Sequence, residues 1–158
     1  MLGAALVSLG ALLVLRRYLQ YLECRLKNTE AIVDLFVAME RGITHSLKSP
    51  EECLLTLQGG ILFDAGVAQA VKEGKSLGEA FDACSEKMLL PEAARSILDE
   101  ELLYLGNGYL EGELKRVRGI IERLRRVSEE EKTKRLERGR VAGAVLFAAV
   151  SGIVLFLA

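Results

Sequence analysis

The sequence contains a single histidine, His45, so any catalytic set that needs an imidazole base has to be built around that residue. The nearest cysteine along the chain is Cys53, which stands beside Leu54 and Leu55 on an amphipathic stretch. A thiol in such a position usually packs as a small hydrophobic side chain and stays protonated. We therefore predict no catalytic residue, and a soluble enzyme built around His45 is the least favoured class of function.

Metal and cofactor motifs are missing as well. The three cysteines form no Cys-x-x-Cys or Cys/His cluster, which argues against a disulfide framework and against a zinc site. Residues 99–101 are all acidic but have no histidine beside them, and the glycines at 59–60 and 106–108 lack the lysine and serine of a phosphate-binding loop. We predict no metal site, no bound cofactor and free thiols in a reducing compartment. The thiols are those of Cys24, Cys53 and Cys84.

No segment shows a sustained alternation of apolar and polar residues, so we predict no β-strand. Apolar residues recur instead with the 4-3 spacing of helices. One stripe over residues 15–36 indicates a long helix that ends near Gly42, since glycine suits a left-handed C-terminal position. A second stripe over residues 110–124 indicates a long helix from Tyr109. Residues 128–132 have no apolar face, which predicts an exposed stalk or a fraying joint.

Shorter helices are expected between these two. Ser49 marks a helix start, because its capping hydroxyl is followed by a proline and two acids. Another helix is expected over residues 61–72. Ser76 and Glu79 have the spacing of a capping box that opens a helix to about residue 87, and Pro91 opens the next one.

The final residues, 141–158, contain no charged side chain. At about 1.5 Å per residue they form a helix of roughly 27 Å, close to the hydrocarbon thickness of a bilayer. The residues before this stretch are basic, and a basic flank is normally retained in the cytoplasm. We predict a membrane helix, with a buried helix of a soluble bundle as the alternative. The basic flank includes Arg135, Arg138 and Arg140.

Residues 1–15 are apolar apart from Ser8, and Arg16 and Arg17 follow them. A secretory signal has its positive charge before the apolar run, so this order favours an uncleaved anchor. The positive-inside rule places the N-terminus outside and the two arginines inside. Fifteen residues cover only about 22 Å, so local thinning or snorkelling arginines must complete the crossing.

Both ends place their basic flanks on the same side of the membrane, which gives an out–in–out topology. The predicted domains are an N-terminal membrane anchor helix at residues 1–17, a cytoplasmic helical domain at 18–137 and a C-terminal transmembrane helix at 138–158. The predicted fold is all-α, with a small antiparallel helical bundle flanked by the two transmembrane helices.

Lysines and arginines outnumber acids between residues 111 and 140, which raises nucleic acid as an alternative partner. Acids are interleaved with these bases, however, and no aromatic residue accompanies them. Retention on the cytoplasmic side and contact with anionic lipid explain the pattern better, so we predict no nucleic-acid binding. Gly139 and Gly143 place small residues on one helix face, which permits close helix packing.

Five stretches follow one another in a recognisable order and spacing. They are Leu-Arg-Arg at 15–17, residues 35–55 with the Gly-Ile-Thr turn at 42–44, Ser-Leu-Gly-Glu-Ala-Phe at 76–81, Leu-Gly at 105–106 and residues 139–158. In this order they resemble the stage III sporulation protein AB family of endospore-forming bacteria, over nearly the whole chain. Ile43 and His45 replace the histidine and proline of the family's turn. Tyr109 and Glu113 stand where the family has an aspartate and a glutamine.

The resemblance implies a role without catalysis. That family belongs to the channel linking mother cell and forespore, in the outer forespore membrane, and its cytoplasmic domain is similar to half of the platform protein of type II secretion and type IV pilus systems. It implies contact with a cytoplasmic secretion-type ATPase and with membrane ring proteins. We expect the ATPase to meet residues 48–52 and 87–92, which the inferred fold places far from the membrane. The alternatives are a platform subunit of a secretion or pilus machine and a generic membrane-anchored interaction protein.

Overall fold

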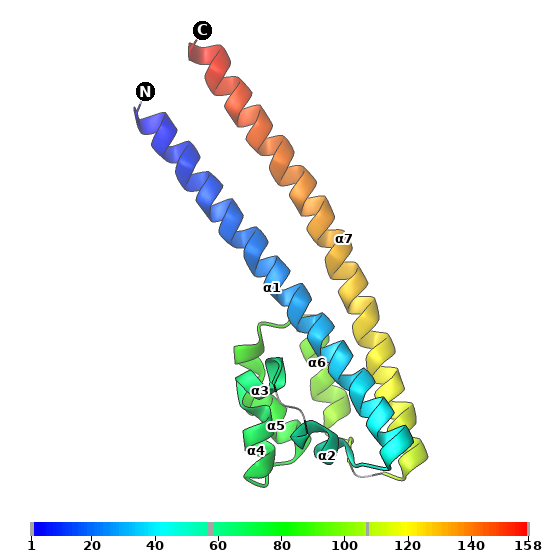
Figure 1. The fold of residues 1–158 in the computed structure, drawn as a ribbon. Coiled ribbons are helices and arrows are strands. Elements are labelled where there is room, and N and C mark those ends of the chain that lie inside the picture. Colours follow the sequence, from blue (N-terminus) through cyan, green and yellow to red (C-terminus); the bar gives the residue numbers. More distant parts are fainter. Residues whose placement is uncertain (1, 57–58, 107, 158) are drawn as a thin grey trace. The chain divides into compact units, whose positions relative to one another are not determined.

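The computed structural model describes residues 2–56, 59–106 and 108–157, with side chains from residue 9 to 145 in these ranges and at 148 and 152. Every element in the described part is a helix, and no strand occurs there, which confirms the predicted all-α class. In chain order the elements are α1 (Leu2–Ser46), α2 (Pro50–Leu55), α3 (Ile61–Ala65), α4 (Val67–Lys72), α5 (Leu77–Cys84), the 3₁₀ helix η1 (Ser85–Met88), α6 (Glu92–Leu102) and α7 (Leu110–Leu157) (Figure 1).

Among the residues that the structure describes, no helix has a stretch long and apolar enough to cross a bilayer. The predicted membrane segments at 1–17 and 138–158 include Met1 and Ala158 and many side chains that lie outside the described residues.

The chain forms two compact units, and each contains part of both long helices. One unit, here called the terminal pair, consists of Met1–Cys24 and Glu130–Ala158. The other, the core domain, is Arg25–Glu129 and also holds all of the short helices.

The core domain is held together by apolar residues of α1 and α7 that are buried in one cluster, and the short helices cover them from one side (Figure 1). Burying a large aliphatic side chain stabilises a fold by roughly 1.5–3 kcal/mol, so these residues dominate the stability of the domain. They include Ile32, Phe36, Met39 and Ile43 of α1 and Val117, Ile120, Ile121 and Leu124 of α7. Of the two predicted stripes, this cluster contains Val33 and Phe36 of α1 and the part of the α7 stripe from Val117 to Leu124, whereas Leu110 is exposed.

The prediction that the first long helix ends near Gly42 is wrong, because α1 continues to Ser46. Gly42 instead lies where α2 approaches α1 most closely. A Cβ atom on Gly42 would stand 2.6 Å from the Sγ of Cys53. The glycine therefore serves helix packing, and the chain reverses at Leu47, which has a φ of 51°.

Both predicted capping motifs are confirmed. The Ser49 backbone N–H donates to the Glu52 carboxylate at 3.0 Å, and the Glu52 N–H donates to the Ser49 hydroxyl at 3.2 Å. Ser76 and Glu79 exchange the same pair of hydrogen bonds at 3.0 and 3.3 Å. Each box satisfies two backbone donors that a helix start leaves open, which fixes where α2 and α5 begin.

The single helix predicted over residues 61–72 is wrong, because Gly66 divides it into α3 and α4. Gly66 has a φ of 94°, a conformation that only glycine adopts at little cost. The break turns the chain, so that Leu62 before it and Val67 after it are both buried in the core.

The fraying joint predicted as one alternative at residues 128–132 is wrong, because α7 runs through this stretch without a break. The other alternative, an exposed stalk, fits Glu129 and Glu130, which are exposed, but not Ser128, which is buried. The spacing explains this, because Ser128 follows Ile121 and Leu124 at the next inward-facing position of the helix. A polar residue thus occupies a buried position, which the apolar pattern alone does not reveal.

Candidate functional site

The basic residues predicted to flank the membrane lie in the terminal pair, where α1 and α7 are antiparallel. The Arg138 guanidinium donates to the Tyr18 hydroxyl at 2.7 Å, and Arg135 donates to the Glu23 carboxylate at 3.1 Å. These two contacts fix the register of the two helices. They bring the basic residues after the first predicted span and those before the second one to the same level.

The predicted packing glycines, Gly139 and Gly143, meet nothing in the described part of the chain. A Cβ atom on either residue would have no heavy atom within 4 Å. Among the described residues nothing packs closely on this face of α7, so its use in helix packing stays a prediction.

The two loops expected to meet a partner lie at opposite ends of the core domain. The Asn28 side-chain amide donates to the backbone carbonyl of Met88 at 2.7 Å, which fastens residues 87–92 beside the beginning of the domain's α1 segment. Residues 48–52 follow Ser46, about 27 Å further along that helix. The two loops are therefore well separated on the core domain, and the contact of the ATPase with either loop stays a prediction.

Several exposed apolar and aromatic side chains lie on elements that meet at the end of the core domain where residues 48–52 lie. The turn between α6 and α7 lies against α2, because a Cβ atom on Gly106 would collide with the Glu51 carboxylate. The start of α7 lies beside the end of α1, since Arg118 and Glu40 form an ion pair at 2.6 Å. We call this surface the distal face. Its exposed residues are Leu47, Leu55, Leu103, Tyr104, Tyr109 and Leu110.

Two tyrosines of the distal face could contact a partner: Tyr109 is almost fully exposed, and Tyr104 is held in place by Arg116. The Tyr109 side chain is 94% exposed at the start of α7. Tyr104 lies under the Arg116 guanidinium at 5.3 Å, and that guanidinium also pairs with Glu101 at 3.3 Å. Clustered exposed apolar residues are typical of protein-binding surfaces, and tyrosine is enriched among the residues that dominate binding energy.

Glu113 organises the turn beneath this face and was not singled out from the sequence as a site residue. Its carboxylate is buried and accepts the backbone N–H groups of Gly106 at 3.0 Å and Gly108 at 2.7 Å. A carboxylate that accepts two backbone N–H groups fixes a turn as strongly as a cap fixes a helix. The only signal in the sequence was the Gly-Asn-Gly run, followed by an acid within the first turn of a helix.

The residues weighed for catalysis and metal binding do not converge. His45 is exposed, whereas Cys53 is buried against Gly42, and burial raises the pKa of its thiol. Within the predicted acidic face, Glu100 and Glu101 form ion pairs with Arg123, both at 2.8 Å. No group of three histidine, cysteine or acidic residues in the described part of the chain is placed to hold a metal ion.

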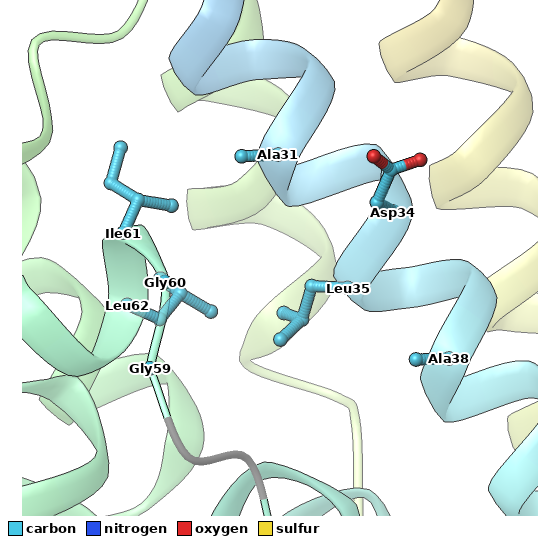
Figure 2. Close-up of a pocket in the computed structure, with 8 residues that line it drawn as sticks. All are labelled: Ala31, Asp34, Leu35, Ala38, Gly59, Gly60, Ile61 and Leu62. Carbon is cyan, nitrogen blue, oxygen red and sulfur yellow. The ribbon is translucent and has the colours of Figure 1, made fainter.

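A hollow of about 230 Å³ lies between α1 and the segment that begins α3. Figure 2 shows Ala31, Leu35 and Ala38 pointing from α1 toward that segment, whereas the carboxylate of Asp34 points away from it. Small-molecule sites usually enclose about 300–1,000 Å³ and contain several converging polar groups. This hollow is smaller and mostly apolar, so it does not have the character of a cofactor site.

A scan against protein-family models, a search of curated proteins and a search of solved structures each return no match for the chain. The fold therefore defines an all-α protein with two helical units, and its function has to be argued from its own residues.

Proposed function

We propose that this protein is a non-enzymatic adaptor that is held in a membrane by its two terminal helices and binds a cytoplasmic partner through its core domain. The resemblance described above supports a more specific role as a platform subunit of the channel between mother cell and forespore. In that role it lies in the outer forespore membrane with the core domain in the cytoplasm. Ring proteins of the channel and a secretion-type ATPase are its expected partners.

The contact between Arg138 and Tyr18 is the observation that carries the proposal. Two antiparallel helices that cross the same bilayer must begin their apolar segments at the same height. Residues 1–15 end just before Arg16 and Arg17, and residues 141–158 begin just after Arg140. Because Tyr18 and Arg138 touch, both boundaries lie within about one helical turn of each other along the pair. A soluble bundle has no need of this alignment.

The topology is tested with single cysteines in a chain from which Cys24, Cys53 and Cys84 have been removed. We expect Ala158→Cys to react with a membrane-impermeant thiol reagent in intact cells, and Lys48→Cys to react only after permeabilisation. The reason is that residue 158 emerges outside whereas residue 48 stays with the core domain inside. Extraction of the chain by salt without detergent, with neither cysteine labelled in intact cells, would contradict the membrane assignment.

The distal face is tested by binding to the cytoplasmic ATPase of the same operon. We expect Tyr109→Ala combined with Leu103→Ala to weaken that binding about tenfold or more, because exposed aromatic anchors dominate such interfaces. Both side chains are exposed, so the free energy of unfolding should change by less than about 0.5 kcal/mol. Binding is measured by titration of the detergent-solubilised full-length chain with the ATPase.

Leu89→Ala is the matched control for that titration. Leu89 is also an exposed leucine, but it belongs to residues 87–92 at the opposite end of the core domain. Its replacement should leave the affinity unchanged. Equal losses from Leu89→Ala and from the distal-face variant would show that the ATPase does not select this face.

A further inference from the structure

The charges of the terminal pair are compensated on the side that leads to the core domain. Arg135 pairs with Glu23 at 3.1 Å, and Lys134 lies 3.7 Å from Glu130 and 3.5 Å from Glu131. Each of these bases therefore has an acid beside it. Ion pairs within the protein therefore neutralise most of the positive charge of Lys134 and Arg135.

Four arginines nearer the chain ends are different, and together we call them the arginine band. Arg16, Arg17 and Arg140 are exposed and form no ion pair with any residue that the structure describes. Arg138 is exposed as well, and its hydrogen-bond partner, the Tyr18 hydroxyl, is neutral. None of these four positive charges therefore forms an ion pair with an acid among the described residues, although the exposed Glu137 stands beside Arg138 in the sequence.

The band is narrow. Arg16 and Arg17 precede Tyr18 by two and one residues, and Arg140 follows Arg138 by two. Because the helices are antiparallel, these offsets point in the same direction along the pair. At about 1.5 Å per residue, all four guanidinium-bearing positions lie within roughly one helical turn.

Exposed apolar residues begin directly on the chain-end side of the band. Leu12, Leu13 and Val14 of α1 are exposed, and so are Val141 and Val145 of α7. On the band itself and just on its other side, Tyr18 and Tyr21 are exposed. Tyrosines and arginines at the border of an apolar surface are typical of residues at the headgroup level of a bilayer.

We propose that the arginine band is a binding site for the phosphate groups of anionic phospholipids. This inference rests on the proposed membrane location and adds a lipid preference to it. Guanidinium groups bind phosphate oxygens in a bidentate manner, and Arg138 is held at the band by Tyr18. A nucleic acid fits less well, since the band is only one turn deep and is bordered by apolar residues that a polyanion would leave exposed to water.

The experiment uses the full-length chain reconstituted into vesicles of phosphatidylcholine alone or mixed with phosphatidylglycerol. Resistance to alkaline extraction reports insertion, and the immobilised fraction of spin-labelled phosphatidylglycerol relative to spin-labelled phosphatidylcholine reports lipid preference. We expect insertion into both vesicles and about a twofold or greater preference for the anionic lipid, weakened by salt. Changing all four arginines to glutamine (R16Q, R17Q, R138Q and R140Q) should abolish the preference and leave insertion intact.

The control variant removes the same number of positive charges from the core domain instead of from the arginine band. R41Q, K87Q, K115Q and R125Q replace four exposed basic residues of the core domain, and the lipid preference should survive these changes. Insertion without any anionic preference overturns the lipid site and leaves the proposed function standing. Failure to insert into either vesicle overturns both. In a further arm, duplex DNA is added to the vesicles. If DNA displaces phosphatidylglycerol from the unchanged chain but not from the variant with all four arginines replaced, the band binds nucleic acid and the proposal is overturned.

Discussion

Gly42→Ala will destabilise the core domain by about 1–3 kcal/mol, whereas Gly119→Ala will stabilise it by about 0.5–1 kcal/mol. Both glycines lie inside long helices, so alanine improves the local helix propensity at both positions. The surroundings of each glycine decide whether alanine raises or lowers the stability of the fold. A Cβ atom at residue 42 meets the Sγ of Cys53 at 2.6 Å, and one at residue 119 meets nothing within 4 Å.

The measurement is thermal and urea unfolding of the purified full-length chain, followed by circular dichroism. Cys53→Ala provides the decisive second background, because it removes the sulfur that the new methyl group strikes. In that background Gly42→Ala should become neutral or stabilising. A loss of stability from Gly42→Ala that is equally large in the Cys53→Ala background would mean that the close approach of α1 and α2 is not the cause.

Glu113→Ala is expected to cost about 2–4 kcal/mol of folding free energy. The substitution removes a buried carboxylate and leaves the Gly106 and Gly108 N–H groups without their acceptor. Hydrogen bonds to a charged group contribute about 1.5–3 kcal/mol each, and an unpaired buried donor carries a further desolvation penalty. The turn that positions Tyr109 should therefore loosen, and binding through the distal face should weaken with it.

Hydrogen exchange of the Gly106 and Gly108 amides separates a local effect from a general loss of stability. Both amides should lose protection in Glu113→Ala before the amides of α5 do. Glu111→Ala removes an exposed acid from the same helical turn, so neither the free energy of unfolding nor the exchange protection of the two amides should change appreciably. Glu113→Gln keeps one acceptor oxygen, so its loss of stability and of amide protection should lie between those of Glu111→Ala and Glu113→Ala. Unchanged exchange at Gly106 in the alanine variant would refute the capping role.

The parts of the fold that follow from local patterns were predictable. Ser49 and Ser76 start helices through side-chain bonds to residues three positions away, and such bonds are visible in a linear sequence. Part of each predicted stripe, such as Phe36 of α1 and Leu124 of α7, is buried as the spacing indicates. Gly42 and Gly66 were misjudged for a common reason, because a glycine has the same appearance in a sequence whether it ends a helix, kinks it or admits a neighbour.

The candidate site was less predictable, because it depends on contacts between distant residues. Arg16 and Arg140 are basic flanks in the sequence, but only the contact of Tyr18 with Arg138 brings them to one level. The separation of residues 87–92 from residues 48–52 could not be read from the sequence, because the bond from Asn28 to Met88 joins residues 60 positions apart. Glu113 was noted only as a departure from the family's glutamine, because the sequence does not show that this residue is buried.

Because the first and last helices both contribute to the core, the chain cannot complete its core until most of it has been synthesised. Glu40 and Arg118 are 78 positions apart, so the apolar stripe of α1 leaves the ribosome long before its counterpart in α7 exists. The local contacts among α2 to α6 can form early, whereas closure of the core has to wait for synthesis of about residue 127. During that interval Ile32, Phe36 and Ile43 of α1 have no partner in α7, and exposed apolar side chains of this kind make a nascent chain prone to aggregation.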